Sequence, residues 1–358
     1  MGRCFVYNPY EIAFCGTNKT AQGRMMTQVI AHGFHDTVVG CVLDRGTESG
    51  EFSIDMGINL FTGDGQHGLM YPAELDTHLG PRPLLDADFV FVETGIDSEL
   101  PKVVWVEDGT PPKCDNVIAY VSEASACPVL PASATYFTDR NVQGVTSAIF
   151  EHFVARANDT PLYGLVLAGG RSERMGSDKA GLEYHGKPQA AHCCDLLSDF
   201  CDDVLVSIRG EQVDHAPFAG LNLMPDRFTG FGPIGGILTA LLEKPEAAWL
   251  VLACDFPYMG DATLEHLVRN RNPFRSITLY IDSVGGLPES LCAIYEPKSV
   301  YRLAGFLAQG FNDLREVFST SDSMFLEPPE EGSLSDVNTG EEFRSVHARL
   351  GGGYEKHE

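Results

Sequence analysis

Short apolar runs alternate with longer segments of mixed polarity along the whole chain. The runs are continuous stretches rich in Val, Leu and Ile, typical of strands buried on both faces of a mostly parallel sheet. They predict strands at 11–15, 37–43, 89–93, 102–106, 117–121, 163–167, 203–208, 248–253 and 276–281. Helical patterns lie between them at 21–32, 143–157, 188–200, 234–243 and 262–270. This alternation of strands and helices predicts an α/β fold in both halves.

The pattern breaks once, near the middle of the chain. Segment 157–161 follows a predicted helix, precedes a new strand and has the composition of a linker. A length of 358 residues also suits two domains better than one. We therefore predict domains at 1–157 and 158–350, and we expect the Gly-rich, charged tail at 351–358 to be disordered.

The charge balance narrows the choice of partners. The chain has 50 acidic and 25 basic side chains, a formal net charge of −25. Such a surface repels nucleic acid and anionic membranes, so neither is an expected partner. It also repels phosphorylated substrates, so any phosphate site must bring its own cations, backbone N–H groups or metal.

The cysteines and the N-terminus bear on the compartment. Ten cysteines are present without a CxxC pair, and several lie in apolar runs. This spacing favours buried reduced thiols over disulfides or zinc. The first residues form neither a signal peptide nor a membrane span, so we expect a cytoplasmic protein.

The strongest motif is the sequence LVLAGGRSERMGSDK at 165–179. An apolar strand leads directly into Gly169 and Gly170, which allow the backbone to approach a ligand closely. Successive N–H groups of such a loop can face phosphate oxygens. Arg174 and Lys179 add the positive charge that the rest of the surface lacks. The alternative, an ordinary strand-to-helix turn, does not account for this grouping.

This loop matches neither GxxxxGK[ST] nor GxGxxG. It resembles LAGGxSxRMGxDK, the signature of the molybdenum cofactor guanylyltransferase family, whose members join GMP from GTP to molybdopterin. The resemblance covers roughly 162–343 and continues through ordered motifs. These are HGKP at 185–188, VLVS at 204–207, Asp226 with GPIGG at 232–236, LACDFP at 252–257 and DVNT at 336–339.

Asp255 follows the apolar run 249–253, so its carboxylate is expected at the carboxyl end of a buried strand, where open α/β sheets bind ligands. Mg²⁺ prefers one or two carboxylates together with phosphate oxygens and water, so one aspartate is sufficient. The alternative for Asp255 is a helix N-cap, but Asp261 suits that role better. The spacing of Asp226 fits either a nucleotide contact or a turn before Gly230.

The resemblance implies a role for each matched residue. Arg174, Lys179 and Asp255 are implied as catalytic, with Mg²⁺ on Asp255. The nucleotide would contact Leu167, Ala168, Gly169, Gly170, Lys179, Ser207, Asp226, Gly232 and Asp255. Lys187 and Asn338 are the candidate contacts to the acceptor. Lys187 precedes Pro188, which is expected at the first position of a helix. Lys187 could neutralise a substrate phosphate, or it could be a solvated lysine without a role in binding. His185 and His192 are expected to be structural or surface residues.

Base choice is inferred from the loop alone. Family members with Gly-Gly use GTP, while related cytidylyltransferases tend to carry Ala-Gly, so Gly169-Gly170 suggests GTP. Three positions depart from the family pattern: Ser207 and Asp336 stand where Asn is usual, and Gly340 where Pro is common. The first departure puts the contact of Ser207 with the nucleotide in question.

The first half carries a weaker signal. FCGTNKTAQGR at 14–24 lies where a P-loop would, but Ala21-Gln22 stand in place of Gly-Lys. Without that lysine, binding and hydrolysis of a γ-phosphate are doubtful. DFVFVETG at 88–95 and PKVV at 101–104 resemble the strand pair of the molybdopterin-guanine dinucleotide adapter family, which has a P-loop fold. We interpret 1–157 as a degenerate adapter-like domain, with an unrelated α/β domain as the alternative.

Together these features predict a Rossmann-like nucleotidyltransferase that joins GTP and molybdopterin, with molybdoenzymes or cofactor-insertion proteins as further partners. Two alternatives stay open. One is another transferase of this fold, acting with CTP or on another phosphorylated metabolite. The other is a non-catalytic protein that binds a nucleotide or a cofactor.

Overall fold

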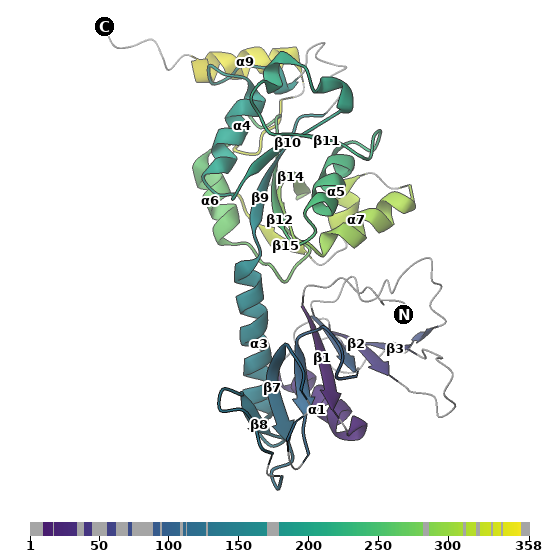
Figure 1. Ribbon diagram of the computed structural model, residues 1–358. Helices are drawn as coiled ribbons and strands as arrows, with labels where there is room; N and C mark the ends of the chain where they lie inside the picture. The colour runs from purple at the N-terminus through teal and green to yellow at the C-terminus, as the bar shows by residue number, and fades with distance from the viewer. Residues whose placement is uncertain are drawn as a thin grey trace. The chain divides into compact units, whose positions relative to one another are not determined.

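The structure is a computed structural model (Figure 1) that describes residues 10–16, 18–33, 39–44, 56–61, 71–73, 89–93, 95–107, 110–111, 113–126, 128–169, 179–281, 286–310, 313–319, 323–330, 332–337 and 339–351. The chain divides into two compact units, Met1–Asp159 and Thr160–Glu358. The predicted division, after residue 157, lies two residues earlier. Among the described residues, no helix has the length and apolar character needed to cross a bilayer.

The first unit contains one mixed sheet. Its elements are β1 (Glu11–Gly16), α1 (Lys19–Gly33), β2 (Val39–Asp44), β3 (Met56–Phe61), β4 (Tyr71–Ala73), β5 (Phe89–Glu93), β6 (Lys102–Trp105), β7 (Val117–Ser122), β8 (Tyr136–Thr138) and α3 (Val142–Asp159). The strand order is β4-β3-β2-β5-β1-β6-β7-β8. The six strands β2, β5, β1, β6, β7 and β8 pair parallel with their neighbours in that series. Strand β3 pairs antiparallel with both β2 and β4. The predicted helix at 143–157 extends to Asp159, so the expected linker begins as helix.

The turn from β1 into α1 has its own local determinants. Gly16 has φ +145°, and a Cβ there would lie 2.4 Å from the Trp105 carbonyl oxygen, so the position requires glycine. The Asn18 side chain accepts a hydrogen bond of 3.0 Å from the Ala21 N–H and caps α1. Gln22, at the position of the P-loop lysine, is buried.

The second unit contains a second mixed sheet. Its elements are β9 (Leu162–Leu167), the short helices η1 (Lys179–Gly181), η2 (Gly210–Gln212) and η3 (Ala216–Phe218), α4 (Gln189–Ser198), β10 (Val204–Ile208), β11 (Leu223–Pro225), α5 (Pro233–Glu243), β12 (Ala248–Ala253), α6 (Asp261–Arg269), β13 (Ile277–Ile281), β14 (Pro288–Tyr295), α7 (Ser299–Ala308), α8 (Leu314–Ser319), β15 (Ser323–Leu326) and α9 (Gly340–Gly351). The strand order is β11-β10-β9-β12-β14-β13-β15. The α/β class predicted from the sequence is confirmed.

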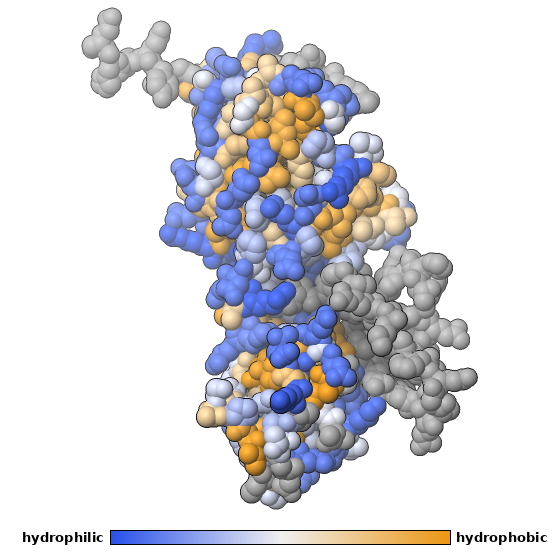
Figure 2. Space-filling model, viewed as in Figure 1, coloured by the Kyte–Doolittle hydropathy of each residue, from blue (hydrophilic) through white to orange (hydrophobic). Residues whose placement is uncertain are grey.

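Helices cover both faces of this second sheet, α4 and α6 on one side and α5 and α7 on the other (Figure 1). Alternate strand residues divide between the two cores. Val166 and Leu250 pack with α4 and α6, while Leu165 and Val251 pack with α5 and α7. On the outer surface, both units carry many hydrophilic side chains in the view of Figure 2. This agrees with the acidic composition of the chain.

The order of the central strands fixes where a ligand can enter. β9 lies between β10 and β12 and is parallel to both. The chain moves outward from β9 to β10 and β11, then crosses back to β12 on the other side of β9. In an open α/β sheet, such a reversal leaves a crevice at the carboxyl ends of the strands.

Three local predictions are corrected. Gly260, not Asp261, is the N-cap of α6, and Asp261 is the first residue of the helix. Pro188 is the N-cap of α4 rather than its first helical residue, because its ψ of 137° is extended. Gly351 ends α9 instead of belonging to the tail, and 352–358 lie outside the described residues.

Candidate active site

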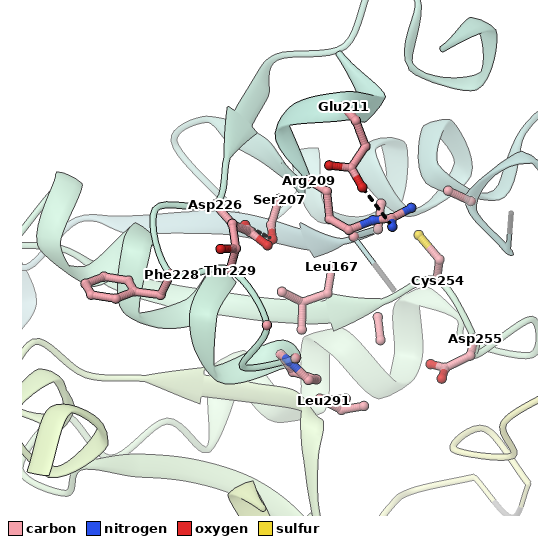
Figure 3. Close-up of a pocket in the computed structure, with 17 residues that line it drawn as sticks. Leu167, Ser207, Arg209, Glu211, Asp226, Phe228, Thr229, Cys254, Asp255 and Leu291 are labelled. Atoms are coloured by element: carbon pink, nitrogen blue, oxygen red, sulfur yellow. Dashed lines mark hydrogen bonds and ion pairs between the residues drawn. The ribbon is translucent and has the colours of Figure 1, made fainter. Parts of the chain in front are cut away.

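A pocket of about 810 Å³ opens at the carboxyl ends of β9, β10 and β12. This volume is in the range of ligand sites for small molecules. Figure 3 shows the side chains around it. The lining residues are Leu167, Ala168, Gly169, Ala180, Ser207, Arg209, Glu211, Asp226, Phe228, Thr229, Gly230, Gly232, Pro233, Ala253, Cys254, Asp255 and Leu291.

The register of the sheet brings three strand ends to the same level. Leu167 of β9 pairs with Ser207 of β10 on one side and with Ala253 of β12 on the other. The Ala168 N–H donates to the Ser207 carbonyl oxygen at 3.0 Å, and the Cys254 N–H donates to the Leu167 carbonyl oxygen at 3.3 Å. The Ala168 N–H is therefore part of the sheet, and any loop amide offered to a ligand must come from a later residue.

Asp226 forms the wall of the pocket beyond β10. Its N–H donates to the Ile208 carbonyl oxygen at 2.8 Å, which fixes its backbone just past the end of β11. Its Oδ1 accepts a hydrogen bond of 2.7 Å from the Ser207 hydroxyl, drawn as a dashed line in Figure 3. Burial raises the pKa of the Asp226 carboxyl, and the bond from Ser207 partly offsets this rise.

Asp255 stands at the other strand end, on the opposite side of Leu167 from Asp226 in Figure 3. Its carbonyl oxygen accepts a hydrogen bond of 2.9 Å from the Val337 N–H, which brings the segment after β15 to this edge of the sheet. No set of three or more His, Cys, Asp or Glu side chains suited to a metal occurs in the described part of the chain. A Mg²⁺ ion here would rely on Asp255 together with phosphate oxygens and water, a donor set that suits this ion.

The third wall is the loop from Asp226 to the start of α5. Gly232, with φ +59°, is the N-cap of α5, and both Gly232 and Pro233 line the pocket. The positive end of the α5 dipole therefore faces the pocket, which favours a negatively charged ligand group. The loop is tied to the helix because the Thr239 hydroxyl accepts a hydrogen bond of 3.0 Å from the Arg227 N–H.

Seven of the predicted nucleotide contacts meet in this pocket: Leu167, Ala168, Gly169, Ser207, Asp226, Gly232 and Asp255. Lys187 is not among the lining residues, and its ammonium group pairs with the Asp195 carboxylate. Lys179 opens η1, but its side chain, like Gly170, Arg174 and Asn338, lies outside what the structure describes.

Several lining residues were not predicted. Arg209, which pairs with Glu211 at 3.1 Å, directly follows β10 and could have been found by extending the strand-end argument. Leu291 comes from β14, a strand absent from the prediction. Cys254 could have been inferred from its place before Asp255. A hydrogen bond with Cys193, together with burial, raises the pKa of the Cys254 thiol, which keeps it protonated.

The two histidines near α4 pack against each other, with ring centroids 3.8 Å apart. His185 Nε2 lies 3.0 Å from the Pro257 carbonyl oxygen. Burial, together with the neighbouring His185 and Lys187, lowers the pKa of His192 to about 4. Neither histidine lines the pocket, and their role as structural or surface residues remains a prediction.

Comparison with known proteins identifies the second unit. Residues 164–324 match the MobA-like NTP transferase domain. A molybdenum cofactor guanylyltransferase of Pseudomonas paraeruginosa is 31% identical over 187 residues, which cover 51% of this chain and 93% of that protein. The chain belongs to the molybdenum cofactor guanylyltransferase family. The family match lies wholly within the second unit, so the resemblance of the first half to the adapter family remains a prediction.

The curated relatives of this chain differ in length. The molybdenum cofactor biosynthesis bifunctional protein of Synechocystis is 33% identical over 193 residues, 54% of this chain and 56% of that protein. The chain thus spans about half the length of the first curated relatives that it matches. A crystal structure of molybdopterin-guanine dinucleotide biosynthesis protein A from Archaeoglobus fulgidus covers 53% of this chain and 99% of its own, with 20% identity and a TM-score of 0.46.

Proposed function

We propose that the second unit transfers GMP from GTP to molybdopterin, forming molybdopterin guanine dinucleotide and releasing pyrophosphate. The observation that carries this proposal is the meeting of Gly169, Asp226 and Asp255 around one pocket at the switch point of the sheet. These residues lie far apart in the sequence and match separate motifs of the family. The names of the curated relatives support the same substrates.

The arrangement suits transfer between phosphates. A phosphate of the acceptor attacks the α-phosphorus in line, and such a nucleophile needs little proton abstraction, so alignment and charge neutralisation are the main requirements. Mg²⁺ bound at Asp255 would supply charge neutralisation at the triphosphate. We propose that Arg174 and Lys179 supply the rest of this charge neutralisation, because a strongly acidic protein needs local cations to hold a triphosphate.

Asp226 is our proposed contact to the base. Guanine presents neighbouring N–H donors on one edge, and an ionised carboxylate accepts such donors well. The backbone of Leu167, Ala168, Gly169 and Gly170, together with Gly232, would enclose the rest of the nucleotide. Lys187 and Asn338 are the proposed acceptor contacts, and Lys187 would first have to exchange its partner Asp195.

The test is pyrophosphate release by the full-length protein, measured with GTP, CTP, ATP or UTP and Mg²⁺, each with and without molybdopterin. We expect release only with GTP and molybdopterin together. Faster release with CTP would overturn the base assignment and favour a cytidylyltransferase. Release with GTP but with a different phosphorylated acceptor would overturn molybdopterin as the substrate.

The same assay tests Asp255. The Asp255→Asn variant should lose turnover by at least about 100-fold, because a neutral amide is a poor ligand for Mg²⁺. Asp199→Asn is the matched control, since Asp199 is an exposed residue at the end of α4 that does not line the pocket. A folded Asp255→Asn protein with normal turnover would remove Asp255 from the mechanism, and a wild-type protein that binds nucleotide without turnover would favour the non-catalytic alternative.

Location and onward partners follow from this function. We propose that the reaction takes place in the cytoplasm and that the product passes to molybdoenzymes or to proteins that insert the cofactor.

A further inference from the structure

Among the polar residues that line the pocket, Ser207 is the one that is buried. Its exposed fraction is 2%. Its hydroxyl donates a hydrogen bond of 2.7 Å to Asp226 Oδ1. A side chain so covered and already bonded has little surface to offer to a nucleotide, although the family pattern implies a direct contact at this position.

We propose that Ser207 is a positioning residue, which acts on the nucleotide by holding the Asp226 carboxylate rather than by touching the ligand. The inference rests on the proposed function and assigns a role to a residue that departs from the usual Asn of the family. One carboxylate oxygen, Oδ1, is taken by the hydroxyl. The other, Oδ2, then lies toward Gly169, where an added Cβ would be 3.3 Å from it.

The packing around Ser207 is built for this contact. A Cβ on Gly236 would lie 2.3 Å from the Ser207 hydroxyl oxygen and 3.2 Å from its Cβ. Only glycine at this position of α5 leaves room for the hydroxyl where it lies. The Ser207–Asp226 pair is therefore enclosed by a glycine on each side, Gly169 from the loop after β9 and Gly236 from α5.

The pair has an electrostatic consequence that can be measured. Burial raises the pKa of Asp226, and the hydrogen bond from Ser207 opposes this rise because it stabilises the ionised form. Loss of the hydroxyl should therefore raise the pKa further. If the ionised carboxylate binds the base, the loss of nucleotide binding at low pH should then begin at a higher pH.

The experiment is a double-mutant cycle in the full-length protein with Ser207→Ala, Asp226→Ala and the double variant. We expect Ser207→Ala to weaken GTP binding by about 10-fold, because a hydrogen bond to a charged group is lost. The KM for GTP should rise while kcat changes little. In the Asp226→Ala background the serine change should add less than about 2-fold, since the carboxylate that accepts its hydrogen bond is absent.

The pH profile separates positioning from a general structural role. In Ser207→Ala, the acid limb of kcat/KM for GTP should move to higher pH, and Ser207→Thr, which retains a hydroxyl, should restore it. The matched control is Ser299→Ala, because Ser299 is also buried and donates a bond of the same length, 2.7 Å, to the Glu296 carbonyl oxygen away from the pocket. That variant should leave the KM and the acid limb unchanged.

The outcomes of this proposal and of the proposed function are distinguishable. Equal effects of Ser207→Ala with and without Asp226 would overturn the positioning role and favour direct contact, as would an unmoved acid limb. If the double variant does not fold, the pH profile of the single variant decides. If another nucleotide is the substrate, only the proposed function fails, and the cycle is measured with that nucleotide; if none binds, both proposals fail.

Discussion

Two carboxylates of the second unit, Asp226 and Glu289, have different surroundings. Asp226 is held by a hydroxyl, whereas Glu289 of β14 lies near Asp255 and Asp336 and accepts a hydrogen bond of 2.8 Å from the Leu291 N–H. Burial, aided by Asp255 and Asp336, raises the pKa of Glu289 to about 7, against the hydrogen bond from Leu291 and the charge of Arg315. Glu289 is therefore a group whose charge changes near neutral pH.

This pKa makes stability depend on pH in a defined direction. The folded state binds a proton at Glu289 more tightly than the unfolded state does, so stability should fall as pH rises from the ordinary glutamate pKa of about 4.5 through about 7. Gln imitates the protonated carboxyl. Without Mg²⁺, the Tm of Glu289→Gln should match that of the wild type at pH 4, below the unfolded pKa, and exceed it at pH 8 by roughly 2–4 °C per kcal/mol of stability that the wild type has lost.

Thermal denaturation across this pH range is the measurement. The exposed Glu327 provides the control substitution, Glu327→Gln, which should give a difference from wild type that does not vary in this way. An equal Tm for Glu289→Gln and wild-type protein at pH 8 would mean that burial does not hold this proton.

At the scale of elements, the sequence predicted the parts that obey a local rule. Strands β9, β10 and β12 are uninterrupted apolar runs, and their carboxyl ends carry the matched motifs, so the crevice could be located in advance. Strand β14 was missed because its sequence, PESLCAIY, begins with polar residues and does not read as one apolar run. It pairs antiparallel with β12 and β13. The place of Leu291 in the pocket therefore depends on the pairing of β14 with its neighbours, and no local sequence pattern encodes that pairing.

The junction of α5 with the loop before it offers a prediction at this scale. A Cβ on Gly235 would lie 2.2 Å from the Phe228 carbonyl oxygen, whereas one on Gly305 of α7 meets nothing within 4 Å. Both glycines are helical, so alanine should favour each helix by about 1 kcal/mol. Gly305→Ala should therefore raise stability, while Gly235→Ala should lower it by about 1–3 kcal/mol because backbone must move.

Urea denaturation of the two variants shows directly whether each substitution raises or lowers the free energy of unfolding. Gly235→Ala should also raise the KM for GTP, since Phe228 lines the pocket, and Gly305→Ala should not. Stabilisation by both substitutions would show that the loop yields to the added methyl group without cost.

At the scale of the whole molecule, charge opposes the proposed substrate. The net charge of −25 creates a negative field that repels a triphosphate before it reaches the pocket. Among the described residues, the N-terminus of α5 favours an anion locally, and we propose that the cations Arg174 and Lys179 add to it. The range of the two effects differs, because salt screens the distant charges over about 8–10 Å but acts less on groups at contact distance.

The balance between them sets the salt dependence of GTP capture. If the distant acidic residues dominate encounter, raising KCl from 20 to 150 mM at fixed free Mg²⁺ should increase kcat/KM for GTP by about 2–5-fold, as repulsion is screened. Potassium glutamate in place of the chloride controls for specific anion competition at the phosphate site. A steep fall in kcat/KM with both salts would mean that the local cations already dominate encounter, and that the acidic surface lies too far from the pocket mouth to affect the substrate.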